Sequence, residues 1–115
     1  MHALIIEDEA LIGLAIQDVL ADNGYTSFDF ASCFDTAVAA AGHRCPDLIT
    51  ADVQLAPGNG IDAVQAICCE KTIPVIFITG TAAEARRRCP NDIVLDKPFS
   101  ARAVAEAVRA ATPPH

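Results

Sequence analysis

Four of the apolar runs in this sequence end in polar side chains that could do chemistry. In chain order these side chains are Glu7 with Asp8, then Asp52, Thr79 and Lys97. Functional residues of a parallel, doubly wound sheet gather at the carboxyl ends of its strands, so we expect all five to meet at one edge. That edge would carry three carboxylates, one hydroxyl and one ammonium group.

This combination of groups predicts a divalent cation and phosphoryl transfer. Crowded carboxylates in a partly desolvated cleft repel one another unless a cation neutralises them. Mg²⁺ suits such a site because it accepts one or two carboxylates together with water and phosphate oxygens. Asp52 would be the nucleophile that forms an acyl phosphate. Lys97 and Thr79 would donate to the phosphoryl oxygens, and Gly80 would leave their approach open.

The elements that must position these residues follow an alternating pattern. Five apolar runs alternate with segments of helical period, which predicts an α/β fold around a central parallel sheet. The expected strands are 3–6, 26–30, 48–51, 74–78 and 93–95. Three of these runs are apolar throughout, as in strands that helices cover on both faces.

The helices between these strands differ in strength. The apolar face expected for the first helix consists of Leu11, Ile12, Ala15, Ile16, Val19 and Leu20. The fourth helix, 82–88, has only about two turns and is the weakest element. The fifth begins at Ser100 as N-cap, with Val104 and Val108 facing inward.

Composition restricts the classes of protein that fit. The chain has 115 residues, 52% of them hydrophobic, which predicts one soluble domain over 1–112 and a tail at 113–115. A net charge of −7 argues against binding to nucleic acid or to anionic membranes. The basic run 86–88 is interpreted as a solvated helix face. No signal peptide or membrane span is visible, so we expect a cytoplasmic protein.

Cysteine and histidine residues add no further site. The five cysteines are odd in number and lack metal-binding spacing, so we expect small, mostly buried apolar residues. His2, His43 and His115 lie outside the set at the strand ends, and we expect them at the surface.

The residues at the strand ends resemble those of response regulator receiver domains. The matching segments are Ile-Ile-Glu-Asp-Glu at 5–9, Asp52, Thr79-Gly80 and Lys97-Pro98-Phe99. The intervals from Asp8 to Asp52 and from Asp52 to Gly60 are similar too. The resemblance covers essentially the whole chain. It implies a flavodoxin-like sheet of five parallel strands in the order 2-1-3-4-5, with five helices of which the fourth is short.

The resemblance also implies roles for single residues. Asp8 and Asp52 would ligate Mg²⁺ directly, Glu7 through water and Gln54 through its backbone carbonyl. The residues that would tune loss of the phosphoryl group are Gln54, Gly80 and Thr81. Pro98 would follow a cis peptide bond.

Two departures from the family pattern concern the segment between Thr79 and Lys97. Many receivers carry Tyr or Phe three residues before the lysine, whereas this chain has Val94. The segment is also shorter than usual by about one helical turn. The run Phe77-Ile78-Thr79-Gly80 resembles a receiver subgroup with a Phe-Ala-Thr-Gly motif, which lacks that aromatic residue as well.

We therefore expect a phospho-accepting signalling module and not a turnover enzyme. Its partners would be a sensor histidine kinase or a histidine phosphotransfer protein, and a downstream protein that contacts the fourth helix, fifth strand and fifth helix. An aspartyl phosphatase is one alternative, but Gln54 stands where its general acid would be. A pseudo-receiver that binds partners without phosphorylation is another. The sequence does not identify the kinase, the target or an output domain.

Overall fold

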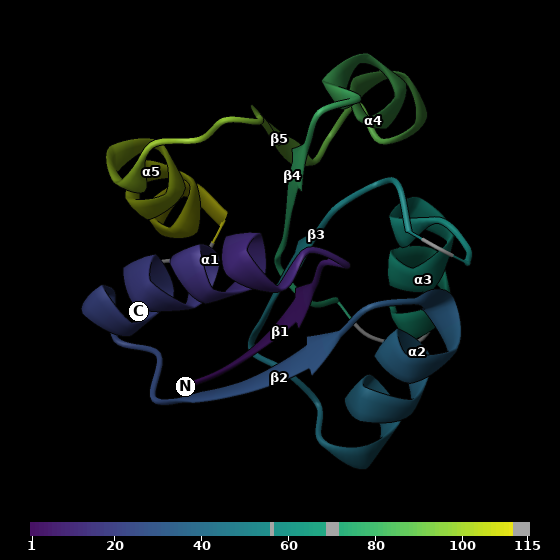
Figure 1. Ribbon diagram of the computed structural model, residues 1–115, viewed down its shortest axis with the longest axis horizontal. Helices are drawn as coiled ribbons and strands as arrows, with labels where there is room; N and C mark the ends of the chain where they lie inside the picture. Colours follow the sequence, from purple (N-terminus) through teal and green to yellow (C-terminus); the bar gives the residue numbers. More distant parts are fainter. Residues whose placement is uncertain (56, 69–71, 112–115) are drawn as a thin grey trace.

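One parallel sheet forms the centre of the molecule. The computed structural model describes residues 1–55, 57–68 and 72–111, so the tail expected at 113–115 lies outside the described residues. The strands are β1 (His2–Ile6), β2 (Ser27–Ala31), β3 (Leu48–Ala51), β4 (Val75–Thr79) and β5 (Ile93–Asp96). They pair in parallel in the order β2-β1-β3-β4-β5, which confirms the predicted topology (Figure 1).

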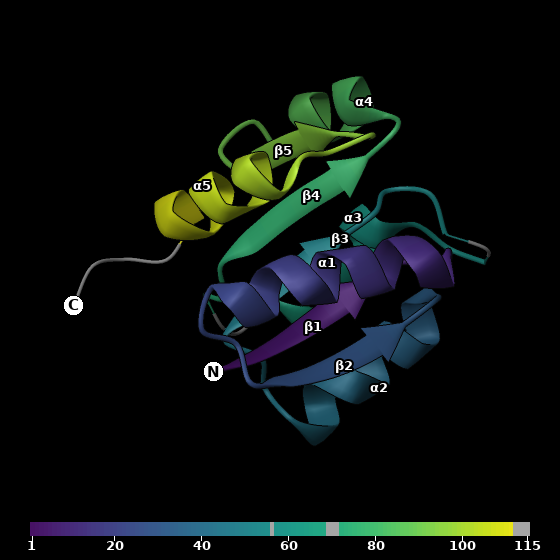
Figure 2. The same ribbon diagram turned by 60° about the vertical axis from the view of Figure 1, so that its left-hand side comes forward.

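Helices cover both faces of this sheet. One face carries α1 (Ala10–Asp22) and α5 (Ala101–Ala111), and the other carries α2 (Phe34–His43), α3 (Gly60–Ile67) and α4 (Ala82–Arg88). The two views together show the three layers (Figures 1 and 2). This arrangement is the flavodoxin-like fold that the sequence predicts.

Each face of the sheet contributes to its own apolar core. β1, β3 and β4 are buried at every residue. The apolar run 3–6 and the part of 74–78 that lies in β4 are thus buried as predicted, whereas 93–95 is only half-buried because β5 lies at the edge of the sheet. Ile49 and Phe77 pack toward α2, α3 and α4, whereas Ile5 and Ile76 pack toward α1 and α5. Two cores therefore hold the central strands, and the carboxyl ends of these strands are set by packing on both sides.

The last two helices match their sequence predictions closely. α4 spans the two turns expected, and its buried side chains are only Ala82 and Ala85. The hydroxyl of Ser100 accepts a hydrogen bond from the Ala103 backbone N–H at 3.0 Å, which confirms the N-cap of α5. Val104 and Val108 are buried. None of the helices in the described part of the chain is long and apolar enough to cross a membrane.

The predicted inner face of α1 is wrong at two positions, because Leu11 and Ala15 are both exposed. Ile16 and Leu20 are buried, but the Leu11 side chain is 82% exposed and Leu14 is 51% exposed. The helix carries apolar residues on more than one side, so spacing alone could not identify the side that meets the core.

The prediction of a surface position for His2 is also wrong. His2 is 3% exposed, and its ring nitrogens lie 2.9 Å from Ser27 Oγ and 2.9 Å from Asp29 Oδ2. Its backbone N–H donates to Asp47 Oδ2 at 2.7 Å. Three polar partners from distant parts of the chain thus satisfy a buried histidine, whereas His43 is exposed as expected.

The cysteines are less buried than predicted. Among the four in the described residues, Cys33, Cys68 and Cys89 are half-buried and Cys45 is exposed. Cys69 lies outside the described residues. Small apolar size did not place these side chains in the core because the buried positions of α2, α3 and α4 are taken by Ala, Ile and Val.

Candidate functional site

The carboxyl ends of the central strands bring the predicted site residues together. Glu7 follows β1, and its backbone N–H bonds to Ala31 O of β2 at 2.9 Å. The Asp52 backbone N–H donates to Ile6 O at 2.9 Å, which sets the end of β3 beside the end of β1. The Lys97 backbone N–H donates to Thr79 O at 3.0 Å, so β5 and β4 end side by side as well.

Three carboxylates form a compact cluster at this edge. One oxygen atom each from Glu7, Asp8 and Asp52 can be chosen so that all three lie within 4.8 Å of one another. Glu7 is 8% exposed and Asp52 is 6% exposed, while Asp8 faces solvent. The site therefore has a buried acidic floor that opens outward through Asp8.

The Lys97 ammonium binds two of these carboxylates at once. Its Nζ lies 2.7 Å from Glu7 Oε1 and 2.8 Å from Asp52 Oδ2. Both distances are short, as expected for hydrogen bonds between charged groups. The cluster thus contains three carboxylates and one ammonium group, so with all three carboxylates ionised two negative charges stay uncompensated.

Burial and the ion pairs of the cluster shift the pKa values of Glu7 and Lys97. Burial raises the pKa of the Glu7 carboxyl above its usual range, and the nearby Asp52 acts in the same direction against the opposing effect of Lys97. Burial alone would lower the pKa of the Lys97 ammonium, but its hydrogen bonds to Asp52 and Glu7 outweigh burial and raise that pKa. Lys97 is therefore charged at neutral pH.

The donor set fits a small divalent cation. Glu7, Asp8 and Asp52 offer oxygen atoms only, which are the ligands that Mg²⁺ prefers. The cluster is also open toward solvent at Asp8, so water and phosphate oxygens could complete the coordination. No other group of three acidic, His or Cys side chains in the described residues comes close enough to hold a metal ion.

The Thr79 hydroxyl is engaged by the residue that begins α4. Thr79 is fully buried, and its Oγ1 accepts a hydrogen bond from the Thr81 backbone N–H at 3.1 Å. The two hydroxyl oxygens of Thr79 and Thr81 also lie 3.1 Å apart. Thr81 is the N-cap of α4, so the hydroxyl at the end of β4 is linked directly to this helix.

A loop after β3 holds the Asp52 carboxylate in place and depends on one glycine. The Gln54 backbone N–H lies 3.4 Å from Asp52 Oδ1, and the Gln54 side chain is exposed. The Gly60 N–H donates to Val53 O at 2.8 Å. A Cβ atom on Gly60 would lie 1.7 Å from the Asp52 carbonyl oxygen, so only glycine fits at this contact. The spacing from Asp52 to Gly60 is visible in the sequence, but this close contact is not, because it depends on how the loop folds back.

The turn after β5 directs Lys97 back over the cluster. The Lys97–Pro98 peptide bond is cis, the isomer that the sequence analysis expects. Phe99 packs against the core between the sheet and the α1–α5 layer. A Cβ atom added to Gly80 would meet nothing within 4 Å.

Comparison with known sequences and structures places this site in context. A family description of the response regulator receiver domain matches residues 3–109. The transcriptional regulatory protein PdtaR of Mycobacterium tuberculosis is 33% identical over 103 residues, which cover 86% of this chain and 50% of PdtaR. The chain thus spans half the length of that relative.

Two solved structures are similar over nearly the whole chain. The receiver domain of PhyR from Erythrobacter litoralis gives a TM-score of 0.87 at 32% identity and covers 99% of this chain and 95% of that domain. PhyR from Brucella abortus gives a TM-score of 0.85 at 33% identity, over 96% of this chain and 46% of that protein.

The close contact at Gly60 predicts the effect of adding one methyl group. Gly60→Ala should lower the free energy of unfolding by about 2–3 kcal/mol, because the Asp52 backbone must shift to make room. Gly42→Ala is the matched control, since Gly42 lies in α2 with nothing within 4 Å of the added Cβ. It should stabilise the protein by about 0.5–1 kcal/mol. Equal effects of the two changes in urea unfolding would contradict this description of the loop.

The raised pKa of Glu7 predicts a pH-dependent cost to stability. A carboxyl whose pKa is higher in the folded chain than in the unfolded chain holds its proton more tightly when folded. The stability that Glu7 contributes through its bound proton is fully present below the unfolded pKa of 4.5. It is lost as the pH rises through the raised pKa of the folded chain, so the ionised carboxylate makes the folded protein less stable at pH 7. In EDTA at pH 7, Glu7→Gln should therefore unfold at higher urea concentration than the wild type.

The advantage of Glu7→Gln should shrink as the pH is lowered toward 4.5. Asp18→Asn, an exposed change on α1, should shift stability by no more than about 0.5 kcal/mol at either pH. A Glu7→Gln protein that is less stable than the wild type at pH 7 would mean that the Glu7–Lys97 ion pair outweighs burial.

Proposed function

Because the chain belongs to the family of response regulator receiver domains of two-component signalling, we propose that it accepts a phosphoryl group on Asp52 and signals this state to a partner protein. The observation that carries the proposal is the Lys97 ammonium held 2.8 Å from the Asp52 carboxylate, beside two further acidic residues. A nucleophile, a cationic donor and candidate metal ligands are thus gathered at one edge of the sheet.

The phosphoryl donor would be a phosphohistidine of a sensor kinase or a phosphotransfer protein. An oxygen of the Asp52 carboxylate attacks phosphorus, and the N–P bond to the histidine breaks. The electron pair of that bond stays on the imidazole, which then takes up a proton. The product is a mixed anhydride between the Asp52 carboxyl group and phosphate.

The residues around Asp52 support this transfer through charge. Lys97 already touches the Asp52 carboxylate, so a phosphoryl group on that side chain would lie within reach of its ammonium. Glu7, Asp8 and Asp52 would hold Mg²⁺, with the Gln54 backbone carbonyl as a further ligand implied by family resemblance. When bound, Mg²⁺ would neutralise the carboxylates and offset the charge on the transferring group.

Loss of the phosphoryl group would be controlled by the residues at the mouth of the site. The Gln54 side chain is exposed and Thr81 is half-buried, so both could screen the phosphorus atom from water. Gly80 leaves open space on the same side. The chain then behaves as a module with two states, which a partner can read and slow hydrolysis resets.

The structural response would begin at Thr79. To bind a phosphoryl oxygen, its hydroxyl would move toward that oxygen and so change its present contacts with Thr81, the N-cap of α4. α4 buries only Ala82 and Ala85, so it is held by little apolar surface and can change position at small cost. We therefore propose that phosphorylation acts by ordering the segment from Thr79 to Lys97, without an aromatic ring that moves inward.

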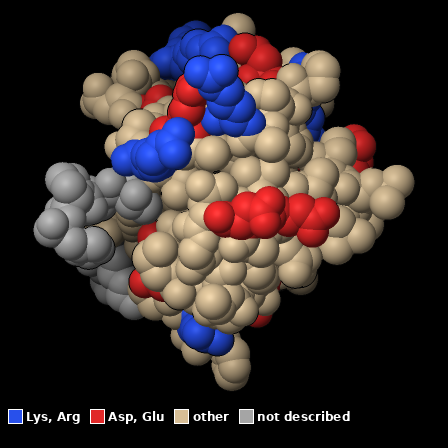
Figure 3. All heavy atoms as spheres, turned by 90° about the vertical axis from the view of Figure 1, so that its left-hand side faces the viewer, with Lys and Arg blue, Asp and Glu red and all other residues tan. Residues whose placement is uncertain are grey.

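The surface that would change, made by α4, β5 and α5, is richer in basic residues than the rest of the protein. Six of the eight Lys and Arg residues lie between positions 86 and 109, although the whole chain has a net charge of −7. Figure 3 shows basic side chains gathered toward the end of the molecule where α4 and α5 lie. A downstream protein would read the face of α4, β5 and α5, which includes Arg86, Val94 and Arg102.

Phosphorylation of Asp52 can be measured by intact mass. After incubation with acetyl phosphate and Mg²⁺, the wild type should gain one phosphoryl group, and EDTA should abolish this gain. Asp52→Asn should gain none, whereas Asp18→Asn should behave as the wild type does. An unchanged wild-type mass with several small-molecule and kinase donors would leave a pseudo-receiver as the better description.

Ordering of the segment from Thr79 to Lys97 can be followed by amide hydrogen exchange. Beryllofluoride with Mg²⁺ should raise protection across 82–94 as well as at the loop after Asp52. Thr79→Ala should abolish the rise across 82–94, and Thr79→Ser, which keeps the hydroxyl, should preserve it. If protection rises only near Asp52 in the wild type, or if Thr79→Ala responds normally, the proposed path through Thr79 is wrong.

A further inference from the structure

In the described residues, the polar contacts between α4 and β5 are made by Arg86. Nη2 of Arg86 lies 3.2 Å from Asp96 Oδ2 and 3.4 Å from the Val94 carbonyl oxygen. Val94 has no ring that could move with α4. Its side chain packs against the core that contains Ala85, and its backbone carbonyl accepts from Arg86. The guanidinium thus spans the last turns of α4 and the end of β5.

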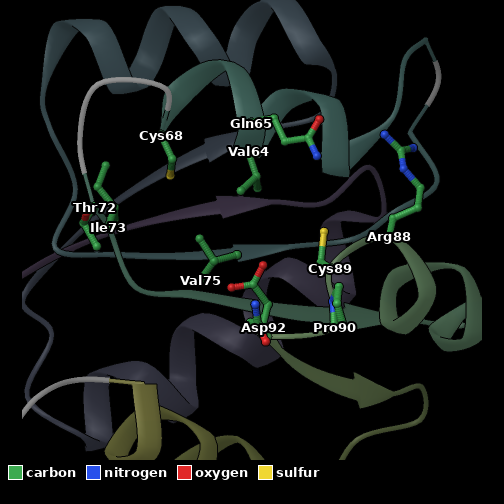
Figure 4. A pocket seen from close by; sticks show the side chains of 11 residues that line it. Val64, Gln65, Cys68, Thr72, Ile73, Val75, Arg88, Cys89, Pro90 and Asp92 are labelled. Carbon is green, nitrogen blue, oxygen red and sulfur yellow. The ribbon is translucent and has the colours of Figure 1, made fainter.

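The opposite side of α4 is held by a different arginine next to a cavity. Nη2 of Arg88 donates to Asp62 Oδ1 of α3 at 2.8 Å. Below this ion pair lies a cavity of about 480 Å³ between α3, the start of β4 and the loop after α4. Figure 4 shows Val64, Val75 and Cys89 around it. On the α3 side, the described residues thus leave an open space beside the C-terminal end of α4, at Arg88 and Cys89.

The polar contacts that hold α4 are therefore the ion pairs of Arg86 and Arg88 and the contact between Thr79 and Thr81. The threonine contact is the one that phosphorylation would change, because Thr79 would move toward a phosphoryl oxygen. The Arg86 pair then becomes the polar link between α4 and the strand that carries Lys97, since Asp96 directly precedes Lys97. Arg87, between the two paired arginines, is exposed, and no contact to another described side chain holds it.

We propose that Arg86, through Asp96 and the Val94 carbonyl, transmits the phosphorylation state of Asp52 to α4. Arg86 is a positioning residue that takes no part in phosphoryl transfer. Lys97 would exchange its contacts with Glu7 and Asp52 for phosphoryl oxygens, which shifts the end of β5, and Asp96 would carry this shift to Arg86. α4 docks on β5 and completes the face that a downstream protein reads. This inference rests on the function proposed above, because it needs a phosphoryl group at Asp52.

The small strength of an exposed ion pair suits this role. The Arg86 and Asp96 side chains are 55% and 67% exposed, so solvent screens their attraction. α4 itself is held by the burial of two alanines, and a weak interaction is therefore enough to bias its position. A strong, buried pair would hold α4 in one place in both states and could not report on Asp52.

The test compares Arg86→Ala with the neighbouring change Arg87→Ala. In the free protein at low salt, Arg86→Ala should speed amide exchange at 82–88 by about two- to fivefold, an effect that 1 M NaCl should largely remove by weakening the wild-type pair. On addition of beryllofluoride and Mg²⁺, the wild type and Arg87→Ala should gain protection at 82–88. Arg86→Ala should gain protection near Asp52 but not at 82–88.

A double-mutant cycle separates transmission from a general loss of helix stability. Asp96→Asn should abolish the gain at 82–88 as Arg86→Ala does, and combining the two changes should add nothing further. Phosphorylation of Asp52 by acetyl phosphate should stay within about twofold of the wild-type rate in Arg86→Ala.

The outcomes distinguish this inference from the function on which it rests. Full protection at 82–88 in Arg86→Ala with bound beryllofluoride overturns the role of Arg86 and leaves the role of Asp52 intact. Additive effects of Arg86→Ala and Asp96→Asn overturn it as well. Failure of the wild type to bind beryllofluoride or to accept a phosphoryl group overturns the proposed function, and the role of Arg86 falls with it.

Discussion

Repulsion among three carboxylates at one edge of the sheet governs the behaviour of this protein. Two unit charges about 5 Å apart repel by about 3 kcal/mol at an effective dielectric constant of about 20. Glu7, Asp8 and Asp52 lie within this range of one another, and the single ammonium of Lys97 compensates only part of their charge. Binding of a cation or neutralisation of a carboxylate would therefore relieve the repulsion at this edge, and either event would change the contacts of Lys97.

The rest of the fold turns this local imbalance into a change of shape. The central strands are buried on both faces, so Glu7, Asp52 and Thr79 have little freedom to move. α4 is different, because two buried alanines and a few polar contacts hold it. A rearrangement of Thr79 or Lys97 would thus be relieved in α4 and not in the sheet. Rigid strands that hold the chemistry, next to one weakly held helix, are what a protein with two states requires.

Much of the site could be predicted from the sequence because it depends on local patterns. Unbroken apolar runs located the strands, and the residues that follow them had to meet at one edge. Glu7, Asp52 and Lys97 were found in this way, and the structure brings them into contact. The short fourth helix was also predictable, since its length follows from the interval between Thr79 and Lys97.

What the sequence could not reveal depends on contacts between distant residues. His2 is buried because Ser27, Asp29 and Asp47 surround it, and no local pattern predicts that meeting. Leu11 is exposed because α1 is apolar on more than one side. The Arg86–Asp96 pair joins residues ten positions apart across a turn, and a run of arginines does not show which of them has a partner.

The central claim is that Asp52 carries the phosphoryl group as an acyl phosphate, and chemical trapping tests it most directly. Borohydride reduces an acyl phosphate to an alcohol, which converts a phosphorylated aspartate to homoserine and releases phosphate. After phosphorylation with acetyl phosphate and Mg²⁺, reduction and digestion, peptide mass mapping should find homoserine at position 52 and nowhere else. Homoserine at Asp8, or a phosphorylated protein that yields no homoserine at all, would contradict this account.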